Sequence, residues 1–433
     1  MRYYNLKDPE ITAGFRDAVI QGISSGMGLF MPERIPVMGH DFFRRLPDMS
    51  LHEIAFEVGA LYTGDDIPLA ELRRICEEAF DFPVVMRQVD ERKQVLELFH
   101  GPTAAFKDFG ARFMSGCFRY FASHDDRKTV VLVATSGDTG GAIASSFLGV
   151  DGIDVVILYP SGKVSMLQEK QLTTLGQNIT AIEVEGTFDD CQAMVRSALT
   201  MMYTGGAIRL TSANSINIAR LIPQSFYYFW AISRAGAGSV LSVPCGNLGN
   251  ITAAALAWRS GLGIEHLVAA TNINKVVPDY LATGLFSPAV SVQTIASAMD
   301  VGNPGNFDRL RQLFENNFAT IQSSVSGYWF DDDSIRQHIT DVYGRSGYIL
   351  DPHGAVASLG LDSYLAGHPG SSGIFVETAH PAKFSDIIEP LIGRPPEMPD
   401  NLEKFISGKK CTVAMKSGYD YLAEYLAERY SLR

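Results

Sequence analysis

The chain has 433 residues, of which 46% are hydrophobic and 19% charged, and it carries a formal net charge of −12. This length exceeds what one hydrophobic core usually organises, so we expect two or three domains. The acidic excess disfavours nucleic acid or an anionic membrane as the main partner, because a polyanion is repelled, and small-molecule chemistry fits better.

Cysteine usage and the chain start indicate the compartment. The five cysteines are scattered and form no Cys-x-x-Cys pair, which disfavours both a zinc site and a disulfide framework. The segment 1–8 has no apolar stretch followed by a cleavage site, so it does not resemble a signal peptide. No run approaches the roughly 20 apolar residues of a membrane helix. We therefore expect a soluble cytoplasmic protein.

The first 95 residues predict a mainly helical region. Within 67–79, Leu69, Leu72, Ile75 and Cys76 recur at helical spacing and fall on one face. Charged residues fill the intervening positions, as on the exposed side of an amphipathic helix.

From Thr129 onward the pattern changes to apolar, β-branched runs separated by helix-length segments. Such runs are typical of parallel strands covered by helices on both faces. A first series of strands is predicted at 130–134, 155–159 and 179–184, and a second at 240–244, 267–271 and 374–376.

Two series of strands predict two α/β units with a cleft between them. The glycine-rich stretch 234–239 is a plausible boundary, and the proline-rich stretch 395–399 precedes a last helix at 419–426. We therefore predict a helical region at 1–95, a smaller α/β domain at 96–235 and a larger one at 236–433.

Lys107 is the first candidate for chemistry. A single lysine is by default a solvated surface group. The apolar neighbours Ala104, Ala105, Phe106 and Phe109 change that expectation, because they would keep the amine away from bulk water. Desolvation lowers the pKa of an amine toward the range in which it acts as nucleophile and base.

A polar, glycine-containing loop at 135–140 (Thr-Ser-Gly-Asp-Thr-Gly) follows the strand 130–134 and leads into a predicted helix at 140–147. It could be an ordinary capped strand-to-helix turn. The loop also suits an anion bound at a helix N-terminus, because its glycines let the backbone approach a ligand and hydroxyls stand at 135, 136 and 139.

A second loop at 246–250 (Gly-Asn-Leu-Gly-Asn) follows the strand 240–244 and precedes the helical segment 251–257. A lone Gly-x-x-Gly is weak evidence, and a tight turn is the simpler interpretation. In this context the loop fits a phosphate held by backbone N–H groups without a basic residue. No Walker lysine motif is present, so nucleotide binding is not implied.

Two further segments carry polar groups. Asn214, Ser215 and Arg220 lie in one run whose arginine offers a planar fork suited to a phosphoryl group. From these residues alone, a helix N-cap with a surface arginine is the favoured interpretation. Thr378 directly follows a predicted strand. His353 and His380 are each more often structural, and neither is predicted as a site residue.

Several collinear segments resemble the threonine synthase family of fold-type II pyridoxal-phosphate enzymes, and together they run nearly end to end. These segments are 4–7, 28–32, 98–103, 106–110, 212–217, 298–300 and 377–383. The resemblance implies a tryptophan synthase β-like fold, with pyridoxal 5'-phosphate in the cleft between two parallel-sheet domains.

The resemblance also implies roles for the cofactor-binding residues. Lys107 would form the Schiff base, Thr378 would face the pyridine nitrogen and Asp138 would lie near the phenolic oxygen. An aspartate beside an oxyanion needs a shared proton or a compensating cation. The cofactor phosphate would be held by the second loop, that is Gly246, Asn247, Leu248, Gly249 and Asn250.

For the substrate, the resemblance implies a carboxylate site and a phosphate site. The carboxylate would bind the first loop, and Thr139 would also reach the phosphate. The phosphate would bind the 214–220 run, with Lys163 as a possible helper. The implied substrate-binding residues are Thr135, Ser136, Gly137, Thr139, Asn214, Ser215 and Arg220.

The implied reaction converts O-phospho-L-homoserine and water to L-threonine and phosphate, the last step of threonine biosynthesis. A phospho-lyase acting on the same substrate remains an alternative, as does a serine or threonine dehydratase-type β-eliminase, which would have no use for a phosphate site at 214–220. A catalytically silent relative is disfavoured because Lys107 and the loop glycines are retained. Monomer and homodimer both stay open.

Overall fold

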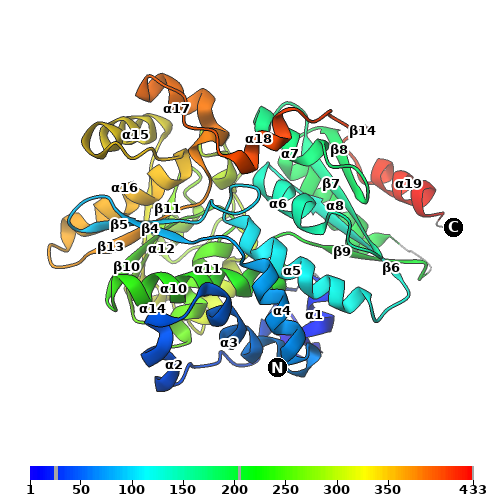
Figure 1. The fold of residues 1–433 in the computed structure, drawn as a ribbon, viewed down its shortest axis with the longest axis horizontal. Helices are drawn as coiled ribbons and strands as arrows, with labels where there is room; N and C mark the ends of the chain where they lie inside the picture. The colour runs from blue at the N-terminus through cyan, green and yellow to red at the C-terminus, as the bar shows by residue number, and fades with distance from the viewer. Residues whose placement is uncertain (24–27, 203–205, 432–433) are drawn as a thin grey trace.

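The computed structural model describes residues 1–23, 28–202 and 206–431. Its backbone forms two mainly parallel sheets that lie side by side, each flanked by helices, with the N-terminal helices packed beneath them (Figure 1).

The larger sheet has the strand order β12-β11-β10-β13-β5-β4, in which every neighbouring pair is parallel except β4 and β5. Its core strands are almost fully buried because helices cover both faces, which suits their apolar, β-branched sequences. The strands are β4 (Val85–Gln88), β5 (Lys93–Glu97), β10 (Ser239–Pro244), β11 (Ile264–Thr271), β12 (Val325–Trp329) and β13 (Gly373–Glu377).

The smaller sheet has the order β14-β8-β7-β6-β9 and is parallel throughout. Its strands are β6 (Lys128–Ala134), β7 (Ile153–Pro160), β8 (Ile179–Glu185), β9 (Ile208–Ser212) and β14 (Val413–Lys416).

The helices between Lys107 and the C-terminal region surround these sheets. They are α5 (Lys107–Ala122), α6 (Asp138–Phe147), α7 (Met166–Thr173), α8 (Phe188–Met201), α9 (Ile218–Leu221), α10 (Phe226–Ala235), α11 (Gly249–Arg259), α12 (Val276–Thr283), α13 (Phe307–Leu313), α14 (Phe318–Ser324), α15 (Asp332–Ser346), α16 (Pro352–Gly367), α17 (Ser385–Ile392), α18 (Asp400–Ile406) and α19 (Tyr419–Tyr430), with the short 3₁₀ turns η4 (Ile222–Ser225), η5 (Ser297–Met299) and η6 (Pro381–Phe384).

The N-terminal region is mainly helical, as predicted, but it also contains a small antiparallel sheet of order β2-β1-β3. Its elements are β1 (Arg2–Asn5), β2 (Thr12–Gly14), α1 (Phe15–Gln21), β3 (Phe30–Pro32), α2 (His40–Arg45), η2 (Leu46–Asp48), α3 (Leu51–Thr63), η3 (Gly64–Asp66) and α4 (Leu69–Ala79). Helix α3 begins at a capping box formed by Ser50 and Glu53, and α4 presents Leu72, Ile75 and Cys76 to the interior.

The N-terminal region shares one hydrophobic core with the α/β units. The Phe80 ring, after α4, meets the edge of Phe226 in α10, with ring centroids 5.8 Å apart. The buried guanidinium of Arg309 in α13 donates from Nη2 and Nε to the carbonyl oxygen of Phe30, at 2.8 and 3.1 Å. These contacts anchor the region against the α/β units.

Every strand predicted from the sequence is present, extended by one to three residues. Three sheet memberships differ from the expected division of the chain. Strand β4 lies within the predicted N-terminal region and β5 crosses the predicted boundary at 95, yet both belong to the larger sheet. Strand β14 pairs with β8 of the smaller sheet although it follows residue 236. The physical reason is that strand pairing is a non-local contact, whereas the boundaries were drawn from local composition. The boundaries at 95 and 235 themselves stay a prediction.

Strand order explains where ligands can bind. In the larger sheet, β11 and β12 lie on one side of β10 and β13 lies on the other; in the smaller sheet, β7 and β8 lie on one side of β6 and β9 lies on the other. Crevices outside the carboxyl ends of strands form where the strand order reverses in this way. The loops that follow β6 and β10 line one common cavity.

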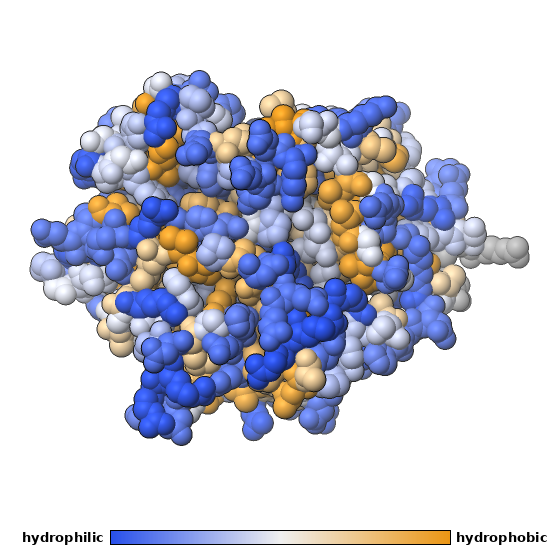
Figure 2. All heavy atoms as spheres, in the orientation of Figure 1, coloured by the Kyte–Doolittle hydropathy of each residue, from blue (hydrophilic) through white to orange (hydrophobic). Residues whose placement is uncertain are grey.

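Much of the face shown in Figure 2 is hydrophilic, with hydrophobic side chains in separate small patches. Within the described ranges, no helix is both long enough and apolar enough to cross a membrane.

Candidate active site

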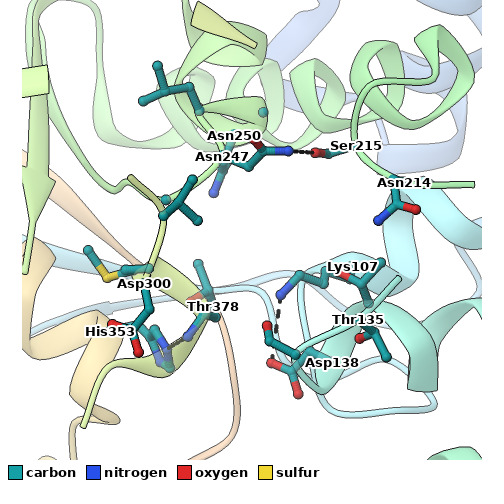
Figure 3. A pocket seen from close by; sticks show the side chains of 18 of the residues that line it. Lys107, Thr135, Asp138, Asn214, Ser215, Asn247, Asn250, Asp300, His353 and Thr378 are labelled. Atoms are coloured by element: carbon teal, nitrogen blue, oxygen red, sulfur yellow. Dashed lines mark hydrogen bonds and ion pairs between the residues drawn. The ribbon is translucent and has the colours of Figure 1, made fainter. Parts of the chain in front are cut away.

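A cleft of about 1020 Å³ lies between the two sheets, at the carboxyl ends of their strands. Figure 3 shows side chains from both α/β units pointing into it. With the exception of Gly137, every residue predicted for the site lines this cleft: Lys107, Thr135, Ser136, Asp138, Thr139, Asn214, Ser215, Arg220, Gly246, Asn247, Leu248, Gly249, Asn250 and Thr378.

Lys107 is the first residue of α5, and two local devices hold it in the cleft. The buried Asp108 carboxylate accepts hydrogen bonds from the N–H and hydroxyl of Thr103, at 2.8 and 2.6 Å, which folds the preceding loop over the helix start. The segment before Lys107 pairs with the segment after β13, where the Phe106 N–H donates to the Thr378 carbonyl at 2.8 Å. Lys107 and Thr378, far apart in sequence, therefore become neighbours.

The Lys107 amine lies 3.9 Å from a carboxylate oxygen of Asp138 (Figure 3). Burial lowers the pKa of Lys107 from its ordinary value, and the opposing attraction of Asp138 does not fully restore it. A lowered pKa makes a neutral, nucleophilic amine more accessible. The predicted desolvation of this lysine is present in the structure.

Asp138 is buried, yet it has two cationic neighbours. Its Oδ1 lies 2.9 Å from the Lys383 amine and accepts a hydrogen bond from the Gln168 side chain, also at 2.9 Å. Burial alone would raise the pKa of Asp138, but Lys383 and Lys107 outweigh it and hold that pKa well below its usual range. Lys383 is thus the compensating cation that an aspartate at this position requires.

The first loop, 135–140, ends at the N-terminus of α6. The Thr135 hydroxyl is engaged inside the loop, accepting from the N–H groups of Gly137 and Gly140 at 2.9 Å each. Gly137 has φ 142°, a backbone conformation that favours glycine, and a Cβ there would lie 2.5 Å from the Gln168 side chain. Gly137 and Thr135 shape the turn, while Ser136 and Thr139 line the cleft beside the N–H groups of the helix start.

The second loop, 246–250, presents the N-terminus of α11 to the cleft. Leu248 adopts a left-handed conformation with φ 59°, which is uncommon for such a residue and turns the chain directly into the helix. Asn250 Oδ1 accepts hydrogen bonds from the hydroxyls of Tyr227 and Tyr228, at 2.6 and 2.7 Å. Its buried Nδ2 has no partner within the part of the chain that the structure describes.

The side chain of Asn247 serves as a brace. It donates to the Ser215 hydroxyl at 2.7 Å and accepts from the Gly305 N–H (Figure 3). Asn214 is a second brace, since its Nδ2 donates to the carbonyl of Ala134 at 2.8 Å and so joins the ends of β9 and β6. These contacts fix the positions of both loops.

Arg220, in α9, is 2% exposed and lines the cleft. Its Nη1 donates to the Ala213 carbonyl at 2.6 Å. Among the described residues, its buried Nε has no hydrogen-bond partner and the guanidinium forms no ion pair. Burial lowers the pKa of Arg220 to about 10. The predicted helix N-cap is present, since Asn217 caps α9. The prediction that Arg220 lies on the surface is wrong, because α9 packs against α5, where Gly110 leaves room for the arginine.

Sequence reasoning missed one wall of the cleft. This wall consists of residues 297–301, which include the η5 turn, and of His353 at the start of α16. Asp300 accepts hydrogen bonds from Asn272 and from the Thr294 side chain, each at 2.8 Å, and burial still raises its pKa to about 6. The segment 298–300 belongs to the resemblance, which is the signal that marked it, although no role was attached to it.

His353 is held on both sides: its Nδ1 lies 2.6 Å from Asp351, and its Nε2 accepts from the Ala298 N–H at 3.1 Å. His380 caps the η6 turn through Nδ1. Lys163 is exposed and lies outside the lining of the cleft.

Two observations test whether the cleft fits pyridoxal phosphate. The N-terminus of α11, with the unpartnered Asn250 amide beside it, suits a phosphate dianion. Gly246 lets the η5 segment approach the second loop closely, since a Cβ there would lie 2.6 Å from the Ala298 carbonyl oxygen and 3.0 Å from the Met299 Cα. The residues present fit the cofactor, and the Lys107 amine lies in the same cleft.

Replacing Gly246 by alanine is expected to weaken cofactor binding by about tenfold or more, because backbone on the opposite wall would have to move. Titration of the cofactor-depleted protein with pyridoxal phosphate measures this. Gly344→Ala is the matched control, since a Cβ at this α15 position meets nothing within 4 Å. Equal cofactor affinities for the two variants would contradict the predicted role.

Comparison with known proteins supports the same assignment. A family model described as "Pyridoxal-phosphate dependent enzyme" matches residues 95–376, and one described as "Threonine synthase N terminus" matches residues 2–80. The chain is 41% identical to threonine synthase of Haemophilus influenzae over 98% of this chain and 99% of that one. It is 40% identical to threonine synthase of Escherichia coli over 93% of this chain and 94% of that one.

Solved structures agree with these matches. The crystal structure of threonine synthase from Escherichia coli superposes with a TM-score of 0.94, at 37% identity, over 99% of this chain and 100% of that chain. The pyridoxal-phosphate-bound threonine synthase from Brucella melitensis gives a TM-score of 0.91, at 32% identity, over 99% of both chains. The fold is therefore fold type II, and the chain belongs to the threonine synthase family of pyridoxal-phosphate-dependent enzymes.

Proposed function

We propose that this cleft converts O-phospho-L-homoserine and water to L-threonine and phosphate, with Lys107 as the catalytic residue. The observation that carries the proposal is Arg220, a buried guanidinium that lines the cleft and forms no ion pair within the described residues, where Asp108 acts on it only from beyond ion-pair distance. A buried cation is costly unless it is paired. A phosphorylated substrate would supply the missing anion.

The substrate's two anionic groups match two separate parts of the cleft. We assign its carboxylate to the N-terminus of α6, with Ser136 and Thr139 as hydroxyl donors. We assign its phosphate to Arg220 together with the Ser215 hydroxyl, which Asn247 holds in place. Asn214 acts mainly by bracing the loop end at Ala134.

When bound, pyridoxal phosphate withdraws electrons from the substrate's α-carbon and so makes the neighbouring C–H bonds acidic. Lys107 would take the proton from Cα, because burial lowers its pKa and so leaves more of the amine unprotonated to accept it. Arg220 retains the phosphate as the bond to Cγ breaks, since its charge stabilises the departing anion.

Water must reach Cβ only after phosphate has left, so access to the cleft has to be controlled. The segment after α12 touches α8 where the Ser291 hydroxyl lies 3.4 Å from a carboxylate oxygen of Asp189, next to the cleft-lining Phe188. We propose that the smaller sheet with the 135–140 loop closes on the substrate, and that this contact belongs to the closed arrangement.

The deciding experiment incubates the cofactor-loaded protein with O-phospho-L-homoserine, then quantifies phosphate and identifies the organic product by chromatography. Threonine and phosphate in equal amounts are expected. Phosphate with an oxo acid would move the assignment to a phospho-lyase. No phosphate release would exclude the phosphorylated substrate and direct attention to serine and O-acetylserine, the substrates of β-eliminating and β-replacing relatives.

We further propose that the enzyme works in the cytoplasm. A reducing compartment is consistent with Cys76, Cys117, Cys191 and Cys245, which are buried and unbridged.

A further inference from the structure

Three charged side chains meet at one end of the cleft, and they come from different parts of the fold. Asp138 starts α6 beside the smaller sheet, Lys107 starts α5, and Lys383 lies in η6 after the last strand of the larger sheet. Asp138 Oδ1 lies 2.9 Å from Lys383 and Oδ2 lies 3.9 Å from Lys107. The Lys383 side chain has no exposed surface, whereas Lys107 reaches the cleft.

The two lysines differ in whether they line the cleft. Lys383 does not line the cleft, while Asp138 and Lys107 both do. The closest acid to Lys383 is Asp138, and the buried Asp108, which is tied to Thr103, is a more distant influence. Lys383 therefore contacts Asp138 without lining the cleft, and it acts on Lys107 through its charge alone.

We propose that Lys383 is a positioning residue that keeps Asp138 ionised behind the cofactor site and thereby balances the charge around Lys107. This inference rests on the proposed role of Lys107 and deepens it. The pair also joins η6, next to the larger sheet, to α6, beside the smaller sheet, so the charge around Lys107 depends on the two units being together.

The other charged groups around Lys107 are Arg220 in α9 and Asp351 before α16, and they are unchanged in the variants described below. The two charges of the Lys383–Asp138 pair act on the pKa of Lys107 in opposite directions, since Asp138 raises it and Lys383 lowers it. Removing one partner alone exposes Lys107 to the full field of the other, which within about 4–6 Å shifts a pKa by roughly one unit or more.

Opposite shifts are therefore expected from the two single variants. Lys383→Met leaves the carboxylate unopposed, which favours a proton on the Lys107 nitrogen and raises its titration midpoint. Asp138→Asn leaves the buried ammonium unopposed and lowers that midpoint. The double variant, Lys383→Met with Asp138→Asn, removes both charges and is expected to return the midpoint close to that of the unchanged protein. Lys383→Arg keeps the charge and is expected to move it least.

The test is a pH titration of the cofactor-loaded protein followed by visible absorption, because the spectrum of the bound cofactor reports the protonation of the nitrogen that Lys107 contributes. Thermal unfolding of each variant is recorded in parallel. Lys93→Met is the matched control: this lysine is also buried and paired, with its amine 2.6 Å from Asp362, but it lies outside the cleft. It is expected to change stability and leave the midpoint in place.

Shifts of about one pH unit in opposite directions, cancelled in the double variant, would support the inference. Single variants that leave the midpoint unchanged or shift it in the same direction would overturn it, as would a double variant that behaves like Asp138→Asn. If Lys383→Met does not fold, the comparison of Asp138→Asn with the double variant decides alone. Loss of the cofactor spectrum in Lys107→Ala is a separate check, since a spectrum that persists there would instead refute the proposed role of Lys107.

Discussion

Replacing Lys107 by alanine is expected to lower kcat/KM for O-phospho-L-homoserine by about 10⁴-fold, the upper range for a positioned acid–base group. The variant also loses the amine that anchors the cofactor. Steady-state release of phosphate measures the effect. Because burial already lowers the pKa of Lys107, its removal deletes a desolvated group and is expected to change thermal stability little.

Lys409→Ala is the control for this experiment, since Lys409 is exposed and lies outside the cleft. Its activity is expected to match that of the unchanged protein. A small primary amine added to the Lys107→Ala variant is expected to restore part of the lost activity, because it can substitute for the missing base. Activity of Lys107→Ala within tenfold of normal would remove this lysine from the mechanism.

Arg220→Met is expected to lower kcat/KM by about 10²-fold or more, mainly through a higher KM, because truncating one partner of a buried charge pair typically costs 2–5 kcal/mol. Inhibition by inorganic phosphate is expected to weaken in parallel. Arg220→Lys is expected to recover only part of the loss, since an ammonium cannot reproduce the planar fork of a guanidinium.

Thermal unfolding distinguishes a substrate receptor from a structural arginine. A buried guanidinium with an unpartnered Nε does not stabilise the fold, so Arg220→Met is expected to keep or raise the melting temperature without ligand. Arg196→Met is the control, because Arg196 is exposed in α8 and lines only an adjoining cavity near Asn214. A large drop in stability with unchanged phosphate inhibition would contradict the assignment.

Local sequence determined the elements and the chemistry of the loops. The apolar runs that end at Ala134 and Pro244 specify buried strands, and the glycines that follow each run specify tight turns into helices. Because ligands bind outside the carboxyl ends of parallel strands, each loop could be expected at a binding crevice of its own sheet. The desolvation of Lys107 was equally predictable, since its apolar neighbours adjoin it in the chain, whereas its proposed role came from the family resemblance.

Tertiary structure decided the contacts between distant segments. Three features depend on residues far apart in the chain. They are the pairing of β14 with β8, the antiparallel contact that brings Thr378 beside Lys107, and the burial of Arg220. No local pattern encodes such contacts.

The charge balance at Asp138 shows most clearly what the sequence determined and what the tertiary structure decided. The sequence and its family resemblance indicated that an aspartate at this position needs either a shared proton or a compensating cation, because a carboxylate beside an oxyanion is otherwise too costly. Only the folded chain shows that Lys383, 245 residues away, supplies it. Electrostatic partners are chosen by distance in space, and that distance follows from how the two sheets pack, which the spacing of residues along the chain does not specify.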